Sequence, residues 1–192
     1  MSKRDDILSA ARDLLWERGF EATSPRAVMD RSGAGQGSLY HHFATKKRLA
    51  VAALDEVEER LTGELAGTLG DGTRPPLERV LAWLAAPRDA LRGCRLGRLG
   101  QESSVVEDDE LRQPVARFFE GLERRLRETL AEAVAAGELP KETDVGDLAA
   151  LLVAVVQGGY VASRVLNDPG KLEDATRAAH ALLINAVGSK NG

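Results

Sequence analysis

One stretch near the start of the chain, GAGQGSLYHHF at residues 33–43, concentrates side chains that can form hydrogen bonds. Between Gln36 and His42 it offers an amide, a hydroxyl, a phenol and two adjacent imidazoles, and three glycines expose the backbone around them. Buried polar groups without partners are costly, so this composition is a poor choice for an apolar core. The stretch therefore indicates a surface that binds another molecule.

Two kinds of chemistry can be set aside for this stretch. His41 and His42 lie about 100° apart on a helix, so they cannot bind one metal ion from a single face as an i, i+4 pair can. The remaining histidine, His180, lies far along the chain, and no Ser-His-Asp set, phosphate-binding loop or metal-ligand spacing occurs. We expect no metal, no other cofactor and no catalytic residue.

The charge of the chain is unevenly distributed. The 192 residues carry a net charge of −4, which argues against a general nucleic-acid coat protein. Residues 1–48, however, carry nine Lys/Arg and six Asp/Glu, a net charge of +3, and the remainder carries −7. Positive charge therefore gathers around the polar stretch.

Composition and hydropathy predict a soluble, cytoplasmic protein. A single cysteine, Cys94, excludes an intramolecular disulfide framework. The N-terminus shows no apolar signal segment. The longest apolar stretch without charge, Leu148–Ser163, is shorter than the roughly 20 residues of a membrane-spanning helix. We expect no membrane association.

Helix signals at the N-terminus predict three helices. Ser2 and Asp5 form a capping box before an apolar face, and Gly19 ends that helix. Ser24-Pro25 begins a short second helix, which Ser32-Gly33 ends, and a third runs from Gln36 to His42 or Phe43. Two short helices joined by a Gly-containing turn are typical of a helix-turn-helix.

The rest of the chain also predicts helices, so the fold class is all-α with nine helical elements. Thr45 caps the fourth helix, and Pro87 predicts a kink or an early stop in the fifth. The expected ranges are 46–69, 77–91, 92–103 for a short sixth element, 107–136, 145–166 and 171–187.

Over residues 7–54 the sequence resembles the TetR family of transcriptional regulators. The resemblance lies in ILSAARDLLWERGFEATS, in PRAVMDRSG and above all in GQGSLYHHFATKKRLAVAAL, and GCRLGRLGQE at 93–102 resembles a sixth-helix string of one subgroup. The resemblance implies a DNA-binding domain over residues 1–46 and a regulatory domain over residues 47–192. Gly35, Gln36 and Met29 depart from residues common in the family, which concerns the target sequence and not the architecture.

The resemblance implies that the third helix enters the major groove of double-stranded DNA with its N-terminal residues at the base edges. Gln36 suits adenine, Tyr40 and His42 are expected at phosphates, and His41 at a base or sugar. Gly37 costs about 1 kcal/mol of helix propensity but lets the backbone approach a phosphate. The expected DNA contacts are Thr23, Ser24, Arg26, Gln36, Gly37, Ser38, Tyr40, His41, His42 and Lys46.

Structural alternatives exist for several of these residues. Tyr40 could equally be a core residue, and Lys46, Lys47 and Arg48 alone would more often be a solvated charge run than a phosphate clamp. The combination of the residues, rather than any one of them, predicts DNA binding.

The family resemblance further implies a homodimer that binds an inverted-repeat operator. Helix 145–166 is apolar on all sides and must be covered, and Gly158-Gly159 would let another helix approach. The expected dimer residues are Leu151, Val155, Gly158, Gly159, Ala178 and Leu182. An intramolecular core is the alternative for these residues.

By the same resemblance, a small apolar or amphipathic ligand would enter the regulatory domain and release the DNA. The expected lining is Trp83, Leu99, Phe118, Phe119, Gln157 and Tyr160, each of which could instead be ordinary core. A regulator that needs no ligand, or one that senses oxidants through Cys94, is the alternative; for Cys94 itself, a small packing residue is the more common role.

Overall fold

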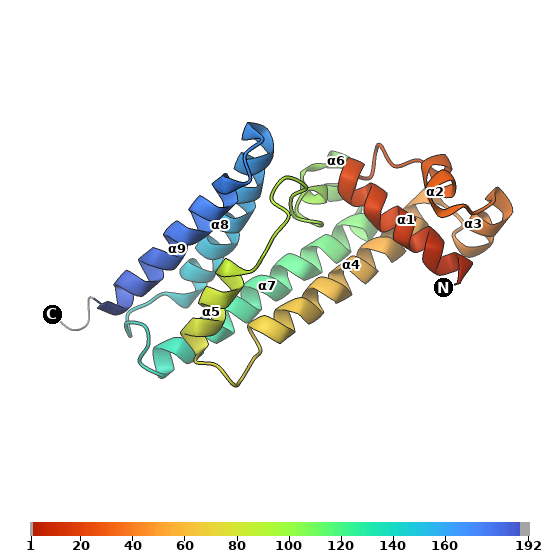
Figure 1. Cartoon of the computed structure of the whole chain (residues 1–192). Helices are drawn as coiled ribbons and strands as arrows, with labels where there is room; N and C mark the ends of the chain where they lie inside the picture. Colours follow the sequence, from red (N-terminus) through yellow and green to blue (C-terminus); the bar gives the residue numbers. More distant parts are fainter. Residues whose placement is uncertain (1, 189–192) are drawn as a thin grey trace. The chain divides into compact units, whose positions relative to one another are not determined.

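The computed structural model describes residues 2–188, and within them the chain forms nine α-helices, a short 3₁₀ helix and no β-strand (Figure 1). The all-α prediction is confirmed. The elements are α1 (Lys3–Arg18), α2 (Pro25–Ser32), α3 (Gln36–His42), α4 (Lys46–Thr68), α5 (Pro76–Ala85), η1 (Leu99–Gln101), α6 (Ser103–Val106), α7 (Asp109–Ala135), α8 (Val145–Leu166) and α9 (Gly170–Gly188).

The chain divides into two compact units. The first unit contains the residues up to Leu61 together with Arg95–Phe118, and the second contains Thr62–Cys94 together with the residues from Phe119 onward. Compactness therefore places the start of α4 and the segment 95–118 with the N-terminal helices. The functional boundary at residues 46 and 47 stays a prediction.

Local capping explains the first three helices. Asp5 N donates to Ser2 Oγ at 3.2 Å and Ser2 N donates to Asp5 Oδ2 at 2.9 Å, which forms the predicted capping box. Ser24 caps α2 by accepting from Ala27 N at 3.1 Å, and Gly33 ends it in the left-handed conformation with φ +62°. These short-range bonds set where the helix-turn-helix begins and turns.

The apolar residues of α1 form its buried face, and α2 and α3 both contact this helix. In α2 the buried residue is Val28, and in α3 it is Leu39. Only one side of each short helix is therefore used for folding. The buried residues of α1 are Ile7, Leu8, Ala10, Ala11, Leu14 and Leu15.

Two predicted helix ranges differ from the structure. Helix α5 ends at Ala85 rather than near Leu91, which is the early stop that Pro87 allowed, because Ala86 precedes Pro87 and adopts an extended conformation with ψ 139°. The segment from Arg92 does not form one element either. Gly93 has φ +83°, and regular structure begins only at Leu99 with η1 and continues in α6.

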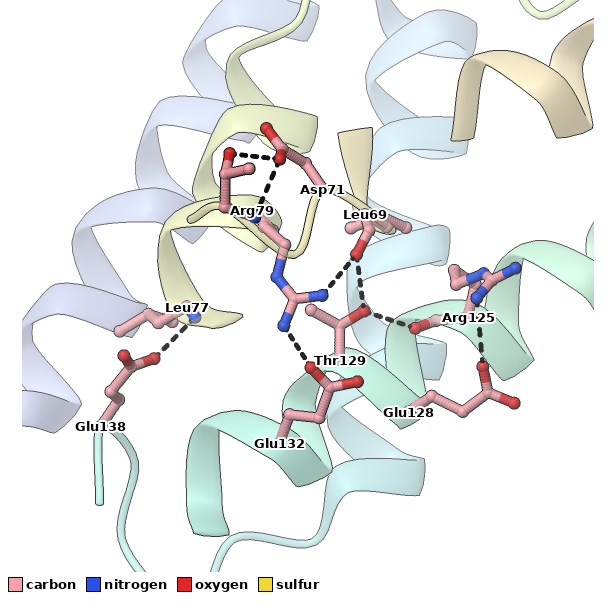
Figure 2. Close-up of polar contacts among 10 residues, drawn as sticks. Leu69, Asp71, Leu77, Arg79, Arg125, Glu128, Thr129, Glu132 and Glu138 are labelled. Atoms are coloured by element: carbon pink, nitrogen blue, oxygen red, sulfur yellow. Dashed lines mark hydrogen bonds and ion pairs between the residues drawn. The ribbon is translucent and has the colours of Figure 1, made fainter. Parts of the chain in front are cut away.

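A buried arginine joins the end of α4 to α7 within the second unit (Figure 2). Arg79 Nη1 donates to the carbonyl oxygen of Leu69 at 2.9 Å, and Nη2 pairs with Glu132. Thr129 Oγ1 donates to the same carbonyl at 3.5 Å. These bonds satisfy a carbonyl that the end of α4 leaves without a helical partner.

Helices α8 and α9 lie side by side, drawn in blue in Figure 1, and Gly159 allows their contact. A Cβ at Gly159 would lie 2.7 Å from Leu172 Cδ1 and 3.1 Å from Leu172 Cα. The close approach predicted for the two glycines is thus confirmed at Gly159, but within one chain, whereas a Cβ at Gly158 would meet nothing within 4 Å.

Helix α8 is also long and apolar enough to cross a membrane by length and composition. Core helices of soluble proteins pass the same test, so this property alone is weak evidence for a membrane span.

Candidate nucleic-acid interface

Helix α3 separates an inward apolar face from an outward polar one. Leu39 is buried, as is Phe43 directly after the helix. Gln36, His41 and His42 are exposed, and Tyr40 keeps 45% of its surface accessible. Ser38 is half-buried. The outward face therefore presents an amide, a phenol and two imidazoles in adjacent turns, the donors and acceptors that DNA bases and phosphates recognise.

Gly37 has no structural reason to be glycine within residues 2–188. A Cβ built there meets no atom within 4 Å, and its φ is not in the left-handed region. Gly35 likewise has open space, and as the N-cap of α3 it provides no side-chain hydrogen bond. The first turn of α3 thus leaves bare backbone N–H groups at its surface.

The residues expected beside α3 behave differently from one another. Ser24 and Arg26 are exposed, and Arg26 Nε lies 3.9 Å from Asp30 Oδ2, a loose surface pair. Thr23 is buried, with 4% of it exposed, and its hydroxyl donates to Gly19 O at 2.6 Å. These contacts favour a role in the α1–α2 turn, and a DNA contact of Thr23 stays a prediction.

Lys46 is held against the same turn. Its Nζ donates to Glu21 O at 3.1 Å and lies 4.4 Å from the centre of the Phe20 ring. These contacts stabilise the α1–α2 turn. The ammonium group has three donors, so it can still donate to a phosphate as well.

The next two basic residues pair with α7 rather than standing as a free charge run. Lys47 Nζ lies 3.1 Å from Asp108 Oδ2 and 2.9 Å from Glu110 Oε1, and Arg48 Nη1 lies 2.8 Å from Glu110 Oε2. The contacts with Glu110 and Asp108 raise the pKa of Lys47. The hydrogen bond from Lys47 is the main cause of the lowered pKa of Asp108.

Sequence reasoning missed Arg4. Its guanidinium lies 5.6 Å from the centre of the Phe43 ring, next to the end of α3, and the residue is exposed. The adjacent cations Lys3-Arg4 were a visible signal, but their place beside α3 depends on how α1 packs. The imidazoles of His41 and His42 contact each other edge to face at 5.1 Å, and residues 2–188 contain no metal-binding cluster.

The expected ligand residues fall in both compact units. Leu99 and Phe118 belong to the first unit and are buried; Trp83, Phe119, Gln157 and Tyr160 belong to the second, where Trp83 is buried and the others are half-buried. The half-burial of Gln157 means that this amide is not sealed in the core. Cys94 is half-buried as well.

Sequence reasoning also missed Arg88 in the second unit. Its guanidinium stacks over Trp83 at 5.2 Å and donates to the carbonyl oxygens of Leu84 and Ala86, both at 2.9 Å. Burial lowers the pKa of Arg88, and the groups that counteract this are Tyr160 and Cys94. Its position directly after Pro87, where α5 stops, was the available signal.

The expected dimer residues lie along an apolar groove of about 560 Å³ formed by α8 and α9. Leu151 and Leu182 line it with 54% and 67% of their surface exposed, and Val155, Gly158 and Ala178 also line it. Gly159 also lines the groove and is buried against Leu172 of its own chain, which favours the intramolecular alternative for this residue, and its role at a dimer surface stays a prediction.

Known proteins share both halves of this arrangement. The family described as bacterial regulatory proteins, tetR family, matches residues 7–53, and the tetracyclin repressor-like C-terminal domain matches residues 76–179. An uncharacterized HTH-type transcriptional regulator in the lacX 3′ region of Lactococcus lactis subsp. lactis is 28% identical over 176 residues, which are 88% of this chain and 87% of that protein. The HTH-type transcriptional repressor DhaR of Mycobacterium sp. is 24% identical, with coverage of 84% and 82%.

Solved structures agree over nearly the full length. A TetR transcriptional regulator from Chloroflexus aurantiacus superimposes with a TM-score of 0.84 at 25% identity, covering 93% of this chain and 92% of that one. These relatives are DNA-binding regulators rather than enzymes, and members of the family typically act as dimers, respond to ligands and are soluble and cytoplasmic. The chain therefore belongs to the tetR family of bacterial regulatory proteins, whose members regulate transcription through a helix-turn-helix.

Proposed function

We propose that the chain is a homodimeric transcriptional repressor that binds an inverted-repeat operator and leaves it when a small apolar or amphipathic ligand binds. The observation that carries the DNA part is the outward face of α3: Gln36, His41 and His42 are exposed on a helix whose other face is buried at Leu39. A helix of this kind fits the major groove of B-DNA.

On this proposal the contacts divide by role. Gln36 contacts a base edge, where its amide suits adenine, and Ser38 and His41 contact a base or the adjacent backbone. Tyr40, His42, Ser24 and Arg26 contact phosphates, as does the bare backbone at Gly37. Lys46 adds a phosphate contact with the donors that its bond to Glu21 leaves unused.

The DNA immediately upstream of the coding region is the first place to seek the operator. We expect an inverted repeat there, bound by the full chain at least about 10³ times more tightly than a scrambled duplex of equal length. The affinity should fall steeply with salt, because phosphate contacts release counterions. Equal affinity for the scrambled duplex at each salt concentration would contradict specific DNA recognition.

The groove along α8 and α9 supports the homodimer. Leu151 and Leu182 are large apolar residues left exposed on a stretch that a single chain does not cover. Large apolar side chains left exposed together along one groove favour an interaction site. A second copy of the same face would cover it and place two α3 helices for two half-sites.

Arg88 supports an amphipathic ligand over a purely apolar one. It is a partly buried cation beside Trp83 and Tyr160, two of the expected lining residues. Thermal unfolding with a panel of carboxylic acids and their neutral amides tests this part. A ligand is expected to raise the melting temperature and to weaken operator binding in parallel. Stabilisation without DNA release would contradict its role as the releasing ligand.

A further inference from the structure

Residues 98–102, far from the helix-turn-helix in sequence, contact the turn that joins α1 to α2. Arg98 Nη1 donates to Trp16 O at 3.2 Å and also to Glu17 O. These carbonyls lie in the last turn of α1, where the helix leaves acceptors without partners and where a cation is favourable.

Glu102 binds the other side of the same turn. Its Oε2 accepts from Phe20 N at 2.9 Å and from Glu21 N at 3.1 Å, and its Oε1 lies 3.2 Å from Phe20 N. A carboxylate that accepts backbone N–H groups makes a charge-assisted bond, which is stronger than a neutral one. Arg98 and Glu102, which we call the turn clamp, thus hold acceptors and donors on either side of Gly19.

Gly19 is required by the turn clamp as well as by its backbone. It has φ +83°, and a Cβ there would lie 1.9 Å from Glu102 Oε1. Any side chain at this position would displace the carboxylate. The helix-stop glycine that the sequence predicts therefore also makes room for a residue 83 positions later in the chain.

The clamped turn leads directly into the helix-turn-helix. Thr23 Oγ1 donates to Gly19 O, and the next residue, Ser24, is the N-cap of α2. Lys46, the first residue of α4, donates to Glu21 O. The position of the turn 19–23 therefore determines where α2 begins, and α3 follows α2 after a short link.

We propose that Arg98 and Glu102 are positioning residues for DNA binding, so that operator affinity depends on where the segment 95–102 holds the α1–α2 turn. The proposal rests on the proposed function, since it presupposes operator binding. The chain passes from the second compact unit into the first at Arg95, directly before the turn clamp. The clamp begins three residues after the chain enters the first unit, and the Arg95 guanidinium at the entry point lies 4.4 Å from the centre of the Trp16 ring, next to the same turn.

The test compares Glu102→Gln with Glu107→Gln in the full chain. Both substitutions remove one carboxylate charge, but Glu107 is exposed and its side chain makes no hydrogen bond among the residues that the structure describes. Hydrogen exchange of the Phe20 and Glu21 amides is expected to be about tenfold faster in Glu102→Gln, the usual effect of losing a charge-assisted bond. Operator affinity is expected to fall about tenfold at temperatures where both proteins are fully folded.

Faster exchange at Phe20 and Glu21 with unchanged operator affinity would overturn the proposal, because the clamp would then only stabilise the fold. Unchanged exchange would also overturn it. If the unsubstituted chain prefers no operator over a scrambled duplex, the proposed function itself fails, which separates the two outcomes.

A second variant guards against misfolding of the first. Gly19→Ala displaces the Glu102 side chain without removing the charge of that carboxylate. The backbone strain of an alanine at position 19 is the same whether residue 102 is Glu or Gln. The two substitutions together should weaken operator binding no more than the stronger one alone, because they break the same contact. Additive losses would show that Gly19 and Glu102 act independently and would contradict the clamp.

Discussion

Gly37 lies in the first turn of α3. The fold would accept a small side chain at this position, but the proposed close approach of a phosphate needs a residue without one. A Cβ at this position meets nothing in the chain. Gly37→Ala should therefore raise the free energy of unfolding by about 1 kcal/mol through helix propensity. The methyl group would also occupy the space through which the backbone approaches a phosphate, so operator affinity should fall. Urea unfolding and gel-shift titration measure the two effects separately.

Gly63→Ala is the matched control. Gly63 lies inside α4 and a Cβ there also meets nothing within 4 Å. This substitution should give a similar gain in stability without loss of operator affinity. If Gly37→Ala stabilises the protein and binds the operator normally, the close approach of DNA to Gly37 is wrong.

Gln36 and Arg26 should differ in what they contribute to DNA binding. Gln36→Ala should cost about 1–3 kcal/mol on the operator and relax the preference at one base pair per half-site. Arg26→Ala should weaken binding to every duplex alike and reduce the salt slope by about one per site. Titrations against a set of single-base operator variants at several salt concentrations distinguish them. A uniform loss for Gln36→Ala would place its amide on the backbone instead.

Residue by residue, the sequence predicted exposure better than it predicted partners. The outward residues Gln36 and His41 followed from the helix boundaries, because the glycines at 33 and 35 that precede α3 are a local signal in the sequence. Thr23 and Lys46 also carry groups that suit phosphates, yet both bind the α1–α2 turn. For Lys46 the partner is 25 residues away, and no local pattern reports such a contact.

At the scale of elements, the start of α7 depends on a charged cap. Asp108 accepts from the backbone N–H of Glu110 at 3.0 Å and Leu111 at 3.3 Å, and it pairs with Lys47 of α4. The pKa of Asp108 is lowered chiefly by Lys47 and that of Lys47 is raised chiefly by Glu110. The two helices are therefore joined by a pair whose strength depends on pH.

The sign of this dependence follows from the two shifts. Because the pKa of Asp108 is lowered in the folded state, its carboxylate stabilises the fold above pH 3.8, and this stabilisation is lost as pH falls through the lowered pKa. Because the pKa of Lys47 is raised in the folded state, its ammonium group stabilises the fold below pH 10.5, and this stabilisation is lost as pH rises through the raised pKa. Lys47→Met should thus be less stable than the unsubstituted chain from about pH 5 to 9, with the difference shrinking in acid. Urea unfolding across pH tests this; a difference that persists at pH 2 would assign the loss to packing.

The far end of α4 depends on Arg79. Arg79→Met would remove the bonds to Leu69 O and Glu132, and we expect a loss of about 1.5–3 kcal/mol, typical of hydrogen bonds from a buried charged group. Arg125→Met is the control in the same region, since Arg125 is exposed and pairs only loosely with Glu128 at 3.8 Å (Figure 2). Equal effects in thermal unfolding would show that the α4–α7 contact at Arg79 adds nothing.

The elements that sequence predicted poorly are those where local signals compete. Proline at 87 allowed either a kink or a stop, and only the extended backbone at Ala86 decides for the stop. Between Gly93 and Gly100 the glycines remove any helical preference, so the course of this segment is set by contacts such as Glu102 with Phe20. Helices with strong caps at both ends, such as α2 and α8, were predicted within a residue or two.

For the whole molecule, the informative helix is α8, because one chain covers only part of its apolar surface. Its sequence is apolar on all sides, which predicted cover on every side. Within the chain only one stripe is buried, formed by Ala149, Leu152, Val156, Gly159 and Ser163. The sequence could not predict how much of the apolar surface of α8 is covered by its own chain. The pattern of apolar residues shows which surface must be covered, but not which molecule covers it.

A charge on the groove lining should therefore separate the two copies of the proposed dimer. Leu151→Glu puts one carboxylate on each copy, and a symmetric interface over the groove would bury both. The cation of the groove lining, Lys171, already pairs with Asp168 of its own chain at 3.5 Å. We expect the dimer dissociation constant to rise about 100-fold or more, since an unpaired buried charge costs about 3–5 kcal/mol. Leu91→Glu makes the same exchange at a residue that is also exposed but lies outside the groove lining, and it should remain dimeric. Light scattering with size-exclusion chromatography gives the mass of each variant.

Gel-shift titration should show that the Leu151→Glu monomer loses operator affinity although its α3 is unchanged. The reason is that one helix-turn-helix contacts only one half-site. A Leu151→Glu protein that stays dimeric would move the interface away from this groove, whatever the fate of DNA binding.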